Sequence, residues 1–187
     1  MHRRTFVLAA AALAAWRPAW GKKAEQGLFI AARPQPLPPL SIADGDGRPV
    51  ELQFPLVLNL WASWCLPCVA ELPALDRLKP DADRLGVSVV ALSIDRAGAA
   101  AVRPAFARIG VKNLAIHTDD TRQAAEALKV SVLPVTILAD RDRREVARFV
   151  GPAAWDQAGG LMAALAEGRA VTPDMAPPLV NHRAAAP

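Results

Sequence analysis

Two cysteines, Cys65 and Cys68, are the residues of this 187-residue chain whose type and spacing most clearly suggest chemistry. They are the only cysteines, and Leu66 and Pro67 separate them. Such a pair can exchange disulfides, because one thiolate attacks a partner's disulfide and the second thiol resolves the mixed disulfide. A bond that closes so short a loop restricts the unfolded chain very little, which disfavours a purely structural disulfide. Structural zinc needs four ligands, and no histidine lies near the pair in the sequence.

The elements around the pair should place Cys65 at the start of a helix. Residues 56–61 form a short apolar run, the length of a buried strand. After the motif, apolar residues recur every three positions, as on one face of a helix: Val69, Leu72, Leu75 and Leu78. Free backbone N–H groups and the positive end of the helix dipole stabilise a thiolate at a helix N-terminus. The sequence therefore predicts a strand, the cysteine pair and a helix over residues 66–79.

The stretch from Asn59 to Pro73 resembles the active site of thioredoxin-like thiol:disulfide oxidoreductases of the TlpA/ResA type. The similarity continues in order along the chain and covers roughly residues 37–167, with further matches at 87–95, 110–114, 132–134 and 151–155. The last two stretches resemble TlpA in particular. The resemblance implies an α/β thioredoxin fold, with a central mixed β-sheet flanked by helices and an N-terminal β-hairpin extension.

Hydrophobic patterns elsewhere agree with that fold class, because strands alternate with helices and a hairpin follows. We predict the N-terminal hairpin around the turn at residues 44–47, which read Asp-Gly-Asp-Gly. Further strands are expected at 87–94, 114–117, 135–139 and 145–150, and helices at 97–109, 121–129 and 153–168.

The resemblance also implies roles for residues near the cysteines. Cys65 would be the exposed attacking thiol and Cys68 the buried resolving one, together forming the redox-active disulfide. Pro134 matches the cis-proline that lies beside the disulfide in the family. We expect substrate contacts at Trp64, Leu66, Pro67, Leu133 and Pro134.

Two polar residues near the motif have two interpretations each. Glu71, three residues after Cys68, is either an ordinary surface acid or a proton acceptor for the cysteine pair, as the matching glutamate is thought to be in ResA-type proteins. Asn59 stands inside an apolar strand, where ordinary thioredoxins carry an acid. Because no acid stands at position 59, Glu71 becomes the more important candidate for a proton acceptor. Asn59 could instead simply satisfy nearby backbone groups.

The N-terminus is typical of an export signal. Arg3-Arg4 precede eleven uncharged residues, 6–16, which is too short a run to span a membrane. The paired arginines suggest a twin-arginine-like signal, with an ordinary Sec signal as the alternative. Three of the 22 basic residues and none of the 18 acidic ones lie in residues 1–21, so this segment contributes most of the net charge of +4. Nothing in the charge pattern indicates nucleic-acid binding.

These observations divide the chain into four parts. Residues 1–21 are expected to be an export signal or an uncleaved membrane anchor, and residues 22–36 a Pro-containing linker. Residues 37–168 form the predicted thioredoxin-like domain. Residues 169–187, which are rich in Ala and Pro and lack periodicity, are expected to be a disordered tail.

The functional prediction is an exported, periplasmic thiol:disulfide oxidoreductase, a monomer without cofactor or metal, that reduces protein disulfides. Resemblance implies clients in cytochrome c or copper and oxidase maturation, and a membrane electron donor of the DsbD/CcdA type. Two alternatives remain open. A copper(I)-binding metallochaperone would normally add a nearby His or Met ligand. A thiol peroxidase would carry Thr two or three residues before its reactive cysteine, where Ala62 and Ser63 stand.

Overall fold

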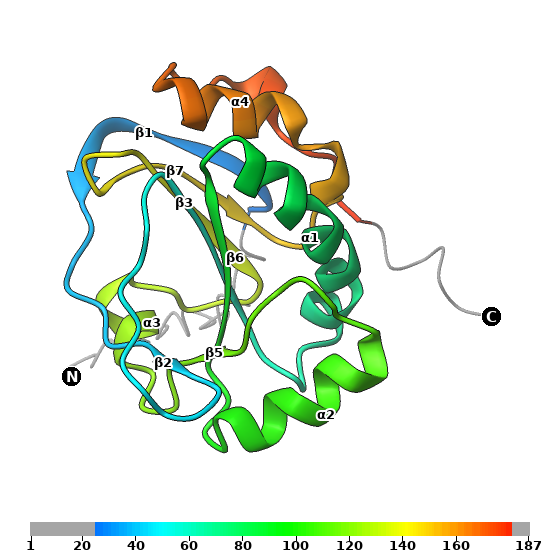
Figure 1. Ribbon diagram of the computed structural model, residues 1–187. Coiled ribbons are helices and arrows are strands. Elements are labelled where there is room, and N and C mark those ends of the chain that lie inside the picture. Colours follow the sequence, from blue (N-terminus) through cyan, green and yellow to red (C-terminus); the bar gives the residue numbers. More distant parts are fainter. Residues whose placement is uncertain (1–24, 181–187) are drawn as a thin grey trace, which may run out of the picture.

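The computed structural model describes residues 25–180, in which a seven-stranded mixed sheet is flanked by helices (Figure 1). The strands are β1 (Gly27–Pro36), β2 (Ala43–Asp44), β3 (Leu56–Trp61), β4 (Ser88–Ser93), β5 (His117–Thr118), β6 (Val135–Ala139) and β7 (Arg144–Val150). The helices are α1 (Leu66–Arg84), α2 (Ala99–Ile109), α3 (Gln123–Ala127) and α4 (Gly159–Glu167), with single 3-10 turns η1 (Trp155–Gln157) and η2 (Pro173–Met175).

Strand β3, which leads into the cysteine motif, lies at the centre of the sheet. The strand order is β1-β7-β6-β3-β4-β5-β2, with β3 parallel to β4 and antiparallel to β6. All six residues of β3 are buried. A strand covered on both faces reads as a continuous apolar run, which explains why β3 could be predicted from the sequence. In Figure 1, α1 and α2 lie to one side of the central strands and α3 to the other.

Helix α1 carries the predicted apolar face into the core, where Leu72 and Leu75 are fully buried. It continues through Pro73 and Pro80, past its predicted end at residue 79. The chain then turns at Gly86, whose φ of 73° is a left-handed conformation that glycine adopts without a steric penalty. The helix therefore spans one side of the sheet and begins at the cysteine motif.

Two aromatic pairs tie the site to the rest of the core. Trp61, the last residue of β3, stacks on Phe106 of α2 with ring centroids 5.5 Å apart. Trp155 meets Phe149 of β7 edge to face at 5.6 Å. Offset and edge-to-face pairs of this kind stabilise a packed core beyond the burial of their area.

The predicted linker over residues 22–36 is wrong for its last ten residues, because residues 27–36 form β1. This strand pairs antiparallel with β7 from Gly27 opposite Val150 to Pro36 opposite Arg144. The register shifts between Ile30 and Gln35. Strand β1 is the outermost strand of the sheet, where prolines are tolerated because half of the backbone N–H groups need no partner strand. Its mostly exposed residues show no alternation that would have revealed it.

The predicted disordered tail, residues 169–187, is also wrong as far as residue 180. Val171 is buried, η2 follows, and Leu179 forms an antiparallel bridge with Ala153. Backbone pairing and single apolar contacts leave no periodic signal in the sequence, so composition alone suggested disorder. The ordered unit therefore extends beyond the predicted domain 37–168 at both ends.

Three smaller predictions also differ from the structure. The predicted closing helix 153–168 begins as extended chain and η1, and its α-helical part starts only at Gly159. The strand expected at 114–117 is the short β5. The N-terminal hairpin is present but short: Asp44 N–H donates to Arg48 O at 2.8 Å and Val50 N–H to Ile42 O at 2.9 Å, around an antiparallel bridge between Ala43 and Pro49. Its first arm, β2, also pairs with β5 at the sheet edge.

The expected export signal or anchor, residues 1–21, lies outside the described residues. Within residues 25–180, none of the helices has the length and apolar character that crossing a membrane requires.

Candidate active site

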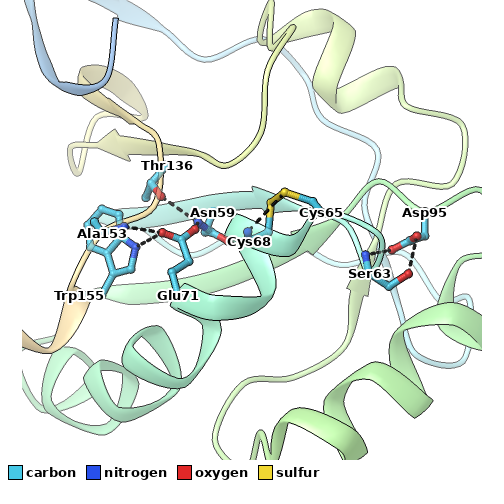
Figure 2. Close-up of a disulfide and its surroundings, with 9 residues drawn as sticks. All are labelled: Asn59, Ser63, Cys65, Cys68, Glu71, Asp95, Thr136, Ala153 and Trp155. Carbon is cyan, nitrogen blue, oxygen red and sulfur yellow. Dashed lines mark hydrogen bonds between the residues drawn. A yellow bond between two sulfur atoms is a disulfide. The ribbon is translucent and has the colours of Figure 1, made fainter. Parts of the chain in front are cut away.

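Cys65 and Cys68 form a disulfide at the N-terminus of α1 (Figure 2). Cys65 is the N-cap residue, with extended backbone torsions, and its Sγ accepts a hydrogen bond from Cys68 N–H at 3.3 Å. The first turn of α1 contains no acidic residue. A thiolate at Cys65 would therefore meet a free backbone donor and the positive end of the helix dipole, without a nearby acid in that turn to oppose it.

The two sulfur-bearing residues differ in access to solvent. Cys65 keeps 7% of its surface exposed, whereas Cys68 has none. The difference follows from the helix, which turns Cys68 toward the sheet while its N-cap stays at the surface. The prediction of an exposed Cys65 is therefore wrong for this oxidised structure, because the disulfide holds Cys65 nearly buried at the helix N-cap, but Cys65 is the more accessible of the two cysteines.

Asp95 fixes the loop that leads from β3 to Cys65. Its carboxylate, which is buried, accepts hydrogen bonds from Ser63 N–H at 2.8 Å and from Ser63 Oγ at 2.9 Å. A third bond comes from Ser93 Oγ at 2.7 Å. Beyond this anchor, Cys65 N–H donates to Ala62 O at 3.1 Å. Asp95 therefore acts on the site through the loop and is a positioning residue.

Three exposed apolar residues come from the two segments at this end of the sheet. Trp64 and Leu66, which flank Cys65 in the chain, are 65% and 80% exposed, and Val132, two residues before Pro134, is 40% exposed. We call these three residues the apolar rim. Large apolar side chains so exposed in a small protein commonly mark a surface that contacts another molecule. Pro67 lies in the first turn of α1, where its missing N–H costs nothing.

The Leu133–Pro134 peptide bond is cis, as the resemblance implied. Pro134 is buried, Leu133 is half-buried, and Pro134 O accepts a hydrogen bond from Gly151 N–H at 2.9 Å. The next residue, Val135, pairs with Leu60 near the end of β3. The proline therefore lies at the same end of the sheet as the cysteine motif.

Glu71 is fully buried, so its interpretation as a surface acid is wrong. One carboxylate oxygen, Oε2, accepts hydrogen bonds from Ala153 N–H at 2.9 Å and from Trp155 Nε1–H at 3.0 Å. The other, Oε1, accepts from Asn59 Nδ2 at 2.7 Å. These contacts converge from α1, β3 and the segment after β7, as Figure 2 shows.

Burial raises the pKa of Glu71 from 4.5 to about 7. The hydrogen bonds from Ala153, Asn59 and Trp155 oppose this shift because they favour the charged carboxylate, but desolvation is the larger effect. A carboxyl group with a pKa near neutrality can both accept and release a proton under ordinary conditions.

Asn59 joins Glu71 to the sheet. Its amide nitrogen donates to Glu71 and also to Thr136 Oγ1 at 2.9 Å, and Thr136 lies directly opposite on β6. The interpretation of Asn59 as a residue that satisfies nearby backbone is therefore wrong. Within residues 25–180, Asn59 Oδ1 is buried and has no hydrogen-bond partner, so one acceptor beside Glu71 remains free.

Four residues of this site were not predicted from the sequence: Asp95, Thr136, Ala153 and Trp155. Each is brought to the motif by the fold, from 32 to 84 positions along the chain. The only sequence signal was the similarity to TlpA around 151–155 and the Asp that closes the strand at 87–94. Among residues 25–180 there is no group of three or more His, Cys, Asp or Glu side chains that could hold a metal ion.

Comparison with known proteins agrees with this geometry. The Redoxin family matches residues 33–164. A curated relative, the thiol-disulfide oxidoreductase ResA of Bacillus thuringiensis, is 28% identical over 129 residues, which cover 67% of this chain and 73% of the relative. ResA of Bacillus subtilis is 30% identical over 118 residues, covering 61% of this chain and 65% of that protein.

Solved structures show the same fold. A thio-disulfide isomerase from Thermus thermophilus is 28% identical, with a TM-score of 0.57, and the match covers 75% of this chain and all of that one. A secreted thiol-disulfide isomerase from Corynebacterium glutamicum is 20% identical, with a TM-score of 0.65 over 87% of this chain and 98% of the other. The predicted α/β thioredoxin fold is thus confirmed. The chain belongs to the Redoxin family, as a thiol-disulfide oxidoreductase with a Cys65–Cys68 pair.

Proposed function

We propose that the protein is an exported reductase of protein disulfides. The observation that carries the proposal is the arrangement of three groups on α1. Cys65 lies at the N-cap and keeps 7% of its surface exposed, Cys68 is fully buried one turn on, and the buried Glu71 follows after another turn. This arrangement supplies an attacking thiol, a resolving thiol and a proton acceptor in the order that reduction needs.

In the reduced protein, the Cys65 thiolate attacks one sulfur of a client disulfide. A Cys65–client bond forms, the client disulfide breaks, and one client sulfur leaves as a thiolate that takes up a proton. The Cys68 thiolate then attacks Cys65 Sγ, which forms the Cys65–Cys68 disulfide and releases the second client thiol. Two electrons pass from the pair to the client, and the protein ends in the oxidised state.

The second step requires Cys68 to lose its proton in a site that water does not reach. Burial raises the pKa of a thiol, so a nearby base is needed. Glu71 lies one turn along the same helix face, and its pKa of about 7 suits that role. We assign Glu71 as the proton acceptor for Cys68. Replacing it with Gln should slow reduction near neutral pH by about 10²-fold, the usual value of a general base.

The apolar rim, together with Pro67, Leu133 and Pro134, is the proposed client surface. Trp64 precedes Cys65, Leu66 and Pro67 begin α1 after it, and Leu133 and Pro134 come from the loop before β6. Apolar contact areas with aromatic anchors tolerate varied partners, which suits a protein that acts on several unfolded or flexible clients. The clients proposed from resemblance are cytochrome c, copper or oxidase maturation proteins.

After each cycle the disulfide must be reduced again. This reduction needs two electrons from another protein. A membrane donor of the DsbD/CcdA type would supply them to the Cys65–Cys68 pair. Export through the N-terminal segment, by a twin-arginine-like or Sec route, would bring the protein to the periplasmic side of that donor.

Trapping of mixed disulfides tests the proposed order of attack. Cys68→Ser should accumulate covalent complexes with clients, because Cys65 still attacks but nothing resolves the bond. The matched control is Cys65→Ser, which should trap none and should lose exchange. The covalent complexes formed by each variant can be counted by non-reducing gel electrophoresis after acid quenching. Trapping by Cys65→Ser and none by Cys68→Ser would contradict the assignment.

A further inference from the structure

The chain beyond α4 returns to the active site and pairs with the segment that follows β7. Ala154 N–H donates to Pro178 O at 2.9 Å, and Val180 N–H donates to Pro152 O, also at 2.9 Å. These two bonds flank the antiparallel bridge between Ala153 and Leu179. In Figure 1 this last described part of the chain is the red segment, which passes close to α4. We call residues 177–180 the strap.

The pairing pattern determines where Ala153 N–H points. In an antiparallel pair whose flanking residues make the hydrogen bonds, the N–H of the bridged residue itself points away from the partner strand. Ala153 is bridged in this way, so its N–H points away from the strap. It donates instead to Glu71 Oε2 at 2.9 Å, beside the bond from Trp155 Nε1 (Figure 2).

The strap is anchored at its start and held by backbone pairing beyond it. Pro177 is buried, and Met175 and Ala176 just before it pack against the core, whereas Pro178 and Leu179 are exposed. On the other side of the pairing, Ala153 has no exposed surface. The segment that holds Glu71 is thus fixed between the carboxylate on its inner side and the strap on its outer side.

We infer that the strap is a positioning element of the active site, which holds residues 152–154 so that Ala153 and Trp155 bind Glu71 and water stays out. The inference rests on the proposed role of Glu71 as proton acceptor. The strap acts through the backbone of Ala153, whose N–H donates to Glu71. It gives the C-terminal segment a function in thiol chemistry, where its composition had suggested a disordered tail.

The groups around Glu71 determine in which direction its pKa should change when the strap is removed. From β3 the uncharged Asn59 donates to Glu71, and Asn59 in turn donates to Thr136 of β6. Cys68 lies one turn before Glu71 on the same helix. Asp156, next to Trp155, is paired at the surface with Arg77 of α1 at 2.7 Å. Desolvation is therefore the main cause of the raised pKa of Glu71, and opening the segment to water should return this pKa toward 4.5.

The test compares full-length protein with three variants of it. Deletion of residues 177–187 removes the strap, and deletion of residues 181–187 is the matched control that keeps it. Val180→Pro leaves the chain length unchanged and removes only the N–H that Pro152 O accepts. The Glu71 carboxyl group is titrated by carbon-13 NMR in the oxidised proteins, and hydrogen exchange of the Ala153 amide is followed in the same samples.

Loss of the strap should lower the titration midpoint of Glu71 by at least about one pH unit, with a smaller shift in the same direction for Val180→Pro. Exchange of the Ala153 amide should be faster by about tenfold, because its hydrogen bond opens more often. The control deletion should match the full chain. If the shortened protein fails to fold, Val180→Pro decides the question.

If the protein without the strap folds, an unchanged titration midpoint of Glu71 would overturn the inference. If it does not fold, an unchanged Glu71 midpoint in Val180→Pro would overturn it. The role of Glu71 is tested separately by Glu71→Gln. Should Glu71→Gln leave the pH profile of client reduction unaltered while strap removal still shifts the Glu71 titration, the positioning would stand and the proton-acceptor role would fall.

Discussion

Replacing Glu71 with Gln should remove a pH-dependent part of the stability of the oxidised protein. The pKa of Glu71 is raised from 4.5 to about 7 in the folded state by burial. A folded state with the higher pKa binds the proton more tightly, so the stabilisation is complete below pH 4.5 and is lost as the pH rises through about 7. With 1.36 kcal/mol for each pKa unit, the free energy of unfolding should fall by about 3 kcal/mol over this range.

Gln has nearly the same shape and cannot ionise. Its side-chain oxygen can accept from Ala153 N–H and Trp155 Nε1–H as the carboxylate does. Its amide can donate to the free Oδ1 of Asn59 after that amide turns over. The two proteins should therefore have similar stability near pH 4.5, and Glu71→Gln should be the more stable by up to about 3 kcal/mol above pH 8.

Urea unfolding of both oxidised proteins between pH 4 and pH 8.5 measures this difference. With a typical urea dependence of 1–3 kcal/mol per molar, the midpoints should separate by roughly 1–3 M at the alkaline end. Glu126→Gln, an exposed position on α3, is the matched control and should follow the wild type at every pH. Other acids titrate in both proteins and cancel in the comparison. A constant difference across the whole range would refute a buried Glu71 with a raised pKa.

Three further predictions follow from the site. Trp64→Ala should raise KM for protein disulfides by about tenfold while leaving exchange with a small disulfide nearly unchanged, since the side chain is 65% exposed and offers contact area that only a protein client would use. Asp95→Asn should lower the rate of Cys65 alkylation at pH 7 by several-fold, measured with iodoacetamide, because the loop anchored through Ser63 loses a charge-assisted bond; an unchanged rate would separate Asp95 from the site. Copper(I) bound to the reduced pair should be stripped by a modest chelator, leaving Cys65 quick to alkylate, whereas a tightly held copper with a protected Cys65 would favour the metallochaperone alternative.

The sequence was most informative where the chemistry is local. The apolar run of β3, the Cys-X-X-Cys motif and the three-residue repeat of α1 are adjacent, so the position of Cys65 at a helix N-terminus followed from the order of residues. The place of Glu71 one turn after Cys68 followed from the same helix. Its burial did not, because burial depends on what packs against that face of α1.

The remaining contacts of the site join distant parts of the chain through groups that carry little sequence signal. Ala153 contributes a backbone N–H, which every residue but proline has, and Trp155 is separated from Glu71 by 84 positions. The strand β1 and the strap are both rich in proline, and each is ordered by pairing with a single neighbouring segment. Composition favoured a linker and a disordered tail there because neither segment has an alternating or helical apolar face.

The reduction potential of the Cys65–Cys68 couple tests the central claim most directly. The purified protein is equilibrated with defined mixtures of reduced and oxidised glutathione at pH 7, and the fraction of disulfide is measured after acid quenching. A reductase is expected near the thioredoxin value of about −270 mV, where the reduced pair gives up its electrons readily. A value near about −120 mV, typical of a strong oxidant, would contradict the assignment as a reductase and would make the protein a donor of disulfides instead.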